Sequence, residues 1–224
     1  MPSHDHQRLS SPLVDWLIKY MARDGLSHLF DLLLTMRRYL CRQPNGSYEL
    51  LDYEATVELL DTKGKQARFK KRQRVKFLQN SVIAFEDYAW GDGDVLTGYQ
   101  CSPGVVVDKY REGDRWNILV SLRSTKSIGD VEQFHIEQDV HNTYLKRNEW
   151  LQTEIRRHTR HLKMNVIFPK ARHCQHAVLA RRHANRSEAL GPEHFDILPD
   201  GRQLLTWETD HVRAYELYTL KWRW

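Results

Sequence analysis

The most regular chemical pattern in this sequence is a row of cations between residues 68 and 76. It places a basic side chain at every second position, at Arg68, Lys70, Arg72, Arg74 and Lys76. On an extended strand, such side chains leave the same face about 6.6 Å apart. A row of this kind could follow the phosphates of a nucleic-acid strand and release their counterions. The pattern therefore predicts a basic strand face.

The same row can be interpreted as one half of a hairpin whose charges are paired. If residues 48–60 and 66–78 turn around 62–64, the numbers of opposed residues add up to about 126. Three cations then meet acids: Glu58 faces Arg68, Glu54 faces Arg72 and Asp52 faces Arg74. Each cross-strand pair would stabilise the hairpin by roughly a few tenths of a kcal/mol. We favour this solvated surface, in which Lys70 and Lys76 lack acidic partners, over a surface for an acidic protein or a nucleic acid.

A second pattern is the acidic, glycine-rich segment 86–94. Asp87, Asp92 and Asp94 place carboxylates close together there, and closely spaced oxygen ligands suit Ca²⁺ or Mg²⁺. The segment lacks the closing Glu of an EF-hand loop. A hairpin turn explains the same composition, because Asp accepts local hydrogen bonds and Gly supplies positive φ. We favour the turn and keep the three aspartates as candidate metal ligands.

Two His-x-x-His pairs lie in the second half of the chain, His158 with His161 and His173 with His176. Their spacing approaches that of small zinc sites. However, residues three apart on a strand point to opposite faces, and neighbouring arginines repel a dication. We therefore expect no metal at these histidines and no cofactor.

Residues 1–46 are expected to form a tail and an α-helical pair. Ser11 and Pro12 suit the start of a helix, and apolar residues then recur at helical spacing as far as Leu40. Trp16 and Tyr20 lie on the apolar face of the first predicted helix. Because an amphipathic helix can dock into a partner's groove, both are candidate contacts with another protein.

After Gly46 the period of the apolar residues changes to two, which indicates strands. Beyond the first hairpin, further strands are predicted near 82–86, 95–100, 104–108, 115–123, 131–140, 150–156, 160–168, 176–182, 203–208 and 212–223. We expect a mainly β domain over 47–224, an antiparallel β-sandwich or open barrel, with a subdivision near residue 145 as the alternative. Because strands do not alternate with helices, we do not expect a parallel-sheet fold.

Composition sets broad limits on location and function. The 224 residues carry a net charge of +5. The three cysteines are widely spaced, which favours a cytoplasmic, reducing location. No apolar run approaches the roughly 18 residues that a transmembrane helix needs. We find no nucleophile elbow, phosphate loop or dinucleotide fingerprint. The leading hypothesis is therefore a non-catalytic protein-binding or adaptor module within a larger assembly.

Two alternatives to the adaptor hypothesis stay open. The first is nucleic-acid binding through the row from Arg68 to Lys76. The second is a metal-dependent hydrolase built on Asp87, Asp92 and Asp94. Binding to a membrane surface is the least favoured, and another protein is the expected partner.

Overall fold

The computed structural model describes residues 46–90, 94–113 and 115–224. The chain divides into two units, 1–43 and 44–224, and every described residue belongs to the second. The predicted helical pair, with Trp16 and Tyr20, lies outside the described residues, and so does Asp92.

The described residues form a mainly β domain, as the sequence predicts. Its strands are β1 (Tyr48–Leu59), β2 (Gln66–Phe77), β3 (Val82–Trp90), β4 (Asp94–Ser102), β5 (Val105–Glu112), β6 (Arg115–Lys126), β7 (Val131–His141), β8 (Asn148–Glu154), β9 (Thr159–Phe168), β10 (His176–Arg181), β11 (Arg186–Ala189), β12 (Phe195–Ile197), β13 (Gln203–Thr209) and β14 (Leu217–Arg223). Each predicted strand is present, whereas the short strands β11 and β12 lack a clear signal in the sequence. The one helix in this part of the chain is the 3₁₀ turn η2 (Pro192–His194). No described helix is long and apolar enough to cross a membrane.

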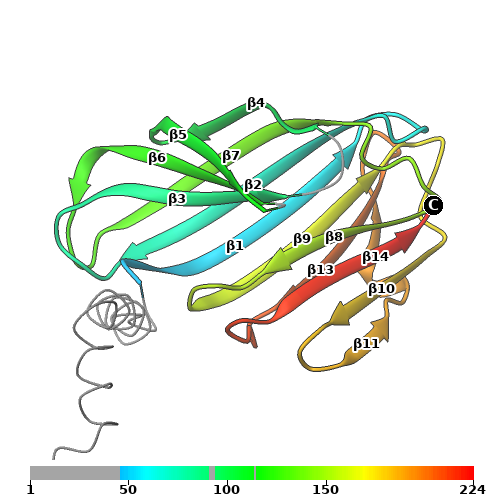
Figure 1. Ribbon diagram of the computed structural model, residues 1–224. Coiled ribbons are helices and arrows are strands. Elements are labelled where there is room, and N and C mark those ends of the chain that lie inside the picture. The colour runs from blue at the N-terminus through cyan, green and yellow to red at the C-terminus, as the bar shows by residue number, and fades with distance from the viewer. Residues whose placement is uncertain (1–45, 91–93, 114) are drawn as a thin grey trace, which may run out of the picture. The chain divides into compact units, whose positions relative to one another are not determined.

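The strands form three sheets (Figure 1). Sheet A has seven strands in the order β12-β13-β9-β1-β2-β7-β4, sheet B has the order β3-β6-β5, and sheet C has the order β11-β10-β14-β8. The three sheets do not close into a barrel. The sandwich is not purely antiparallel, because β1 and β9 pair in parallel at the centre of sheet A. The other strand pairs in the described residues are antiparallel, so this is no parallel-sheet fold, and the crossover from β1 to β9 consists of other strands instead of a helix.

The β1–β2 hairpin has the register that the charges predict. Asp52, Glu54 and Glu58 stand opposite Arg74, Arg72 and Arg68. An irregularity in the ladder at Leu51 changes the alternation, so that Leu50 is buried before it and Ala55, Val57 and Leu59 are buried after it. In the turn, the Asp61 carboxylate accepts the backbone N–H groups of Lys63 and Gln66, both at 2.6 Å.

Sheets B and C cover one face of sheet A, and each encloses its own apolar core. The core under sheet B includes Phe77, Phe85 and Phe134, with the last two rings stacked at 4.1 Å. The core under sheet C includes Met164 and Trp222. We call the opposite face of sheet A its outer face. The strand β14 lies inside sheet C. Its residues Tyr218, Leu220 and Trp222 are buried, and so is Trp224, which follows the strand.

Candidate interaction surfaces

The predicted row of cations lies on the outer face of sheet A, because the alternate residues of β2 are directed into the core. The row comprises Arg68, Lys70, Arg72, Arg74 and Lys76. Two of the predicted ion pairs form across the hairpin: Arg72 lies 2.7 Å from Glu54, and Arg74 lies 2.7 Å from Asp52.

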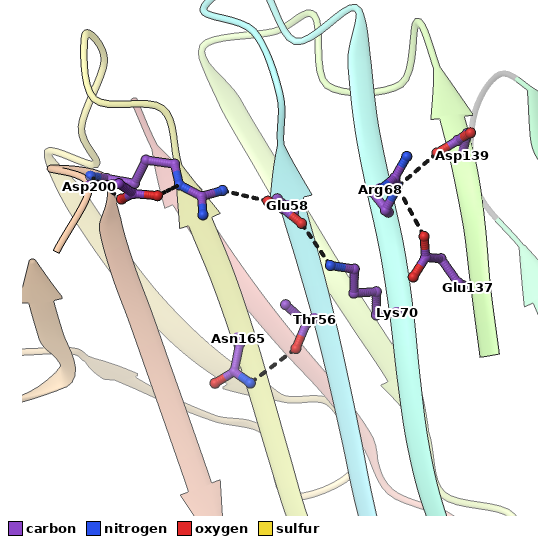
Figure 2. Close-up of polar contacts among 9 residues, drawn as sticks. Thr56, Glu58, Arg68, Lys70, Glu137, Asp139, Asn165 and Asp200 are labelled. Atoms are coloured by element: carbon purple, nitrogen blue, oxygen red, sulfur yellow. Dashed lines mark hydrogen bonds and ion pairs between the residues drawn. The ribbon is translucent and has the colours of Figure 1, made fainter. Parts of the chain in front are cut away.

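Two other members of the row find different partners from those predicted. Arg68 turns away from Glu58 towards β7, where it contacts Asp139 at 3.0 Å and Glu137 at 3.2 Å. Glu58 is then free to pair with Lys70 at 2.9 Å, as Figure 2 shows. Glu58 also forms an ion pair with Arg202. The expectation that Lys70 lacks a partner is therefore wrong. The sequence could not show that β7 and Arg202 lie beside this hairpin.

Lys76 stands at the end of the row and makes no ion pair with the described residues. It lies opposite Glu49 in the ladder. The Glu49 carboxylate instead contacts Arg160 at 2.7 Å and His158 at 3.1 Å. The row therefore presents four neutralised cations and one cation whose facing acid is already used.

The ion pairs change the electrostatics of this face. Burial by itself would raise the pKa of Glu58, but hydrogen bonds from Lys70 and Arg202 outweigh burial and lower it. An incoming phosphate would have to displace a carboxylate from each paired cation and would meet that carboxylate's repulsion. Counterion release, which drives backbone binding, needs cations that are not already neutralised.

The strands on either side of residues 91–93 do not pair with each other, so the hairpin that we favoured for the segment 86–94 is not formed. The first half of this segment belongs to β3 in sheet B, and Asp94 begins β4 in sheet A. Asp87 is buried. Its two carboxylate oxygens contact the Lys71 ammonium at 2.5 Å and the Tyr99 hydroxyl at 2.8 Å.

No cluster of three or more His, Cys, Asp or Glu side chains among the described residues could hold a metal ion. His158 and His161 contact different carboxylates. His158 contacts Glu49, whereas His161 contacts Asp210 at 2.7 Å.

The structure brings together a different set of cations on the exposed face of sheet C. A hollow of about 490 Å³ lies there, and the residues that line it include Arg182, Arg186, Lys221 and Trp150. We call these four residues the basic face. Arg182, Arg186 and Lys221 are exposed and make no ion pair with any described residue. None of the described residues lining the hollow is an Asp or a Glu.

A buried carboxylate holds the hairpin that carries two of these arginines. Glu216 accepts the backbone N–H groups of His183 at 2.8 Å and Ala184 at 3.0 Å, in the turn between β10 and β11. Burial would raise the pKa of this carboxyl, but the backbone donors outweigh burial and lower it. The turn also places Asn185 at a positive φ of 47°. The buried Glu216 carboxylate therefore holds in place the turn that carries Arg182 and Arg186 of the basic face.

Sequence reasoning missed the basic face because its residues are far apart in the chain. Trp150 is on β8, Arg182 and Arg186 flank the β10–β11 turn, and Lys221 is on β14. They meet only because β14 pairs with β8 on one side and with β10 on the other. The available signal was weak: a cluster of basic residues at 181–186 with one acid, Glu188, nearby.

Comparisons with known proteins give no family. No protein-family model matches the sequence, and no curated protein matches it. A solved structure of an M1 zinc metallopeptidase from Deinococcus radiodurans is 11% identical over 79% of this chain, with a TM-score of 0.48. A proposed protease from Parabacteroides distasonis is 7% identical over 80% of this chain, also with a TM-score of 0.48. This chain spans about two fifths of each of those chains, 42% and 41%. Likenesses of this strength carry no argument about the activity of this chain.

Proposed function

We propose that this domain is a non-catalytic binding module that docks an acidic segment of a partner protein onto the basic face. The observation that carries the proposal is the set of three exposed cations without ion-pair partners among the described residues, gathered around one hollow. A partner carboxylate could bind there without displacing an acid that belongs to this chain.

The position of Trp150 supports the same function. Its side chain is 40% exposed on the wall of the hollow, beside Lys221 in the β8–β14 ladder. Trp and Arg are the residue types that most often dominate the binding energy of protein interfaces. An apolar residue of the partner could pack on the indole ring while neighbouring acids meet the cations.

The nucleic-acid alternative has less support from either surface. On the outer face of sheet A, carboxylates already neutralise four of the five cations. On the basic face, Trp150 is the one aromatic residue among those that line the hollow. Proteins that bind single strands usually stack successive bases on several aromatic rings.

Paired charge reversals on the two surfaces test the proposal. The probe is a short fluorescent peptide rich in Glu with one central Phe, titrated at low salt and followed by anisotropy. We expect Arg182→Glu with Lys221→Glu to weaken binding by about tenfold or more, because two attractive charges become repulsive. The matched control, Arg72→Glu with Arg74→Glu, should bind the peptide like the wild type.

The same titration with an oligothymidylate separates the alternatives. Equal loss of peptide binding in both double variants would show that net charge, and not the basic face, attracts the peptide. If the oligonucleotide binds more tightly than the peptide and the basic-face variant abolishes this binding, the domain is a nucleic-acid binder. Peptide binding that does not change in the basic-face variant contradicts the proposal.

A further inference from the structure

Sheets B and C do not join above sheet A, and a cleft separates them. The edge strands β3 and β8 form its two rims, while β1, β2 and β7 of sheet A form its floor. The cleft has a volume of about 60 Å³, and its lining includes Tyr53, Phe69, Lys71, Trp90, Gln138 and Trp150. We call it the seam cleft. A second small cavity of about 50 Å³ shares Tyr53, Lys71 and Trp90 with it.

Aromatic rings make up much of the wall of the seam cleft. Tyr53 and Phe69 come from the floor, Trp90 from one rim and Trp150 from the other. Tyr88 contacts Lys71 through its carbonyl oxygen, while its ring packs against Arg115 and Arg156. Flat rings on several sides favour a flat apolar body between them, because aromatic pairs stabilise contacts beyond the area that they bury.

Polar groups at the floor are few and nearly free of net charge. The Lys71 side chain is 2% exposed, and its ammonium donates to Asp87 at 2.5 Å and to the carbonyl oxygen of Tyr88 at 2.7 Å. An ammonium has three N–H donors, and no third acceptor for Lys71 is found among the described residues. Asp87 already balances the charge of Lys71, and the other carboxylate of the lining, Glu149, accepts the backbone N–H of Lys146. A charged ligand would therefore be desolvated beside charges that already have partners.

Gln138 adds a second polar group without a full set of hydrogen-bond partners to the same lining. Its side chain is 3% exposed, and its Oε1 accepts no hydrogen bond from any described residue. A buried carbonyl oxygen without a donor costs about 1–3 kcal/mol. By contrast, Gln73, also buried and two positions from Lys71, is hydrogen-bonded to the Tyr53 hydroxyl.

We propose that the seam cleft binds a small, uncharged aromatic compound that carries a hydrogen-bond acceptor, such as an aromatic amide. The ring would enter between Trp90 and Trp150, and the acceptor would meet the remaining N–H of Lys71. The volume is below the roughly 150 Å³ of a cavity that encloses benzene, so part of the ligand stays in the open mouth. This site is separate from the basic face, although Trp150 borders both.

Benzamide is the probe, with benzoate and benzylamine as its charged counterparts. We expect benzamide to shift the NMR signals of the Trp90 and Trp150 indole N–H groups and the Gln138 side-chain amide. The charged analogues should shift them at least about tenfold less at equal concentration, since each would lose its hydration in a cleft whose charged groups, Lys71 and Glu149, already have partners. A crystal soaked in benzamide should show the ring in the cleft.

A variant with a matched control tests the location. Ala89 lines the cleft and is 4% exposed. Ala89→Leu should fill the cleft and weaken benzamide binding about tenfold or more, whereas Ala84→Leu, on the same strand but outside the lining, should not. Arg182→Glu with Lys221→Glu should retain benzamide binding, so this inference and the proposed function can fail independently. Ordered water alone in the soaked crystal, or equal binding of all three compounds, would overturn the inference.

Discussion

Neighbouring carboxylates decide what each cation of this domain can do. Arg72 and Arg74 are more regular in sequence than Arg182 and Lys221, yet each already has an acid within 2.7 Å. Pairing of Arg72 with Glu54 could be predicted from the sequence, because both residues lie in one hairpin. Pairing of Arg68 with Asp139 could not, since 71 positions separate the two residues.

One residue-scale prediction concerns Glu216, which supports the basic face. Glu216→Gln should lower the free energy of unfolding by about 1–3 kcal/mol at pH 7, because buried backbone donors lose a charged acceptor. The pKa of this carboxyl is lowered by folding, so its stabilisation is complete above about pH 4.5 and is lost as the pH falls further. Urea titrations of wild type and variant should therefore converge at low pH.

The control for Glu216 is Glu188→Gln. Glu188 forms a half-exposed ion pair with Arg181 at 3.2 Å, and such pairs contribute between about 0 and 1 kcal/mol. A difference between wild type and Glu216→Gln that stays constant down to pH 3 would show that the carboxylate charge does not hold the β10–β11 turn.

At the scale of elements, the sequence pattern predicted the strands and the register of the first hairpin. It could not predict which strands pair when they are far apart in the chain. The period-two alternation gave β1 and β2, and their charges gave the register. Lys71 and Gln73 occupy core positions of β2, and polar residues at core positions are the signal of a special site. The sequence could not show that β3 and β4 belong to different sheets. The glycine-rich link between them is compatible with a β3–β4 hairpin and equally with two strands in separate sheets.

The β1–β2 turn gives an element-scale prediction. Gly64 has a φ of +68°, and a Cβ there would lie 1.8 Å from the carbonyl oxygen of Tyr144. Gly64→Ala should therefore destabilise the domain by roughly 2 kcal/mol or more beyond the cost of the backbone conformation alone.

Gly113 is the matched control for this turn. Its φ is +61°, but a Cβ there would meet nothing within 4 Å. Gly113→Ala should cost only the conformational penalty of about 1–2 kcal/mol. Equal losses in denaturant midpoints for the two variants would contradict the role of the Tyr144 contact.

At the scale of the whole domain, stability should decline from the middle of sheet A to the free edges. β1 and β9 lie between paired strands and over the core, whereas the residues of β5 and β11 are almost all exposed. We expect hydrogen exchange measured by mass spectrometry to be slowest in β1 and β9 and fastest in β5 and β11. Protection of β5 as strong as that of β1 would indicate that another chain covers this edge.

The parallel pairing of β1 with β9 also has a consequence for how the domain acquires its structure. Leu50 stands beside Thr159 in that ladder, so more than a hundred positions of intervening chain must be gathered before the central rung closes. The chain loses the entropy of closing this long loop before the β1–β9 contacts can stabilise it, which makes folding slow. During synthesis the edge of β1 that later pairs with β9 stays unpaired until β9 has been made, and a chaperone that shields this edge would raise the yield of native protein.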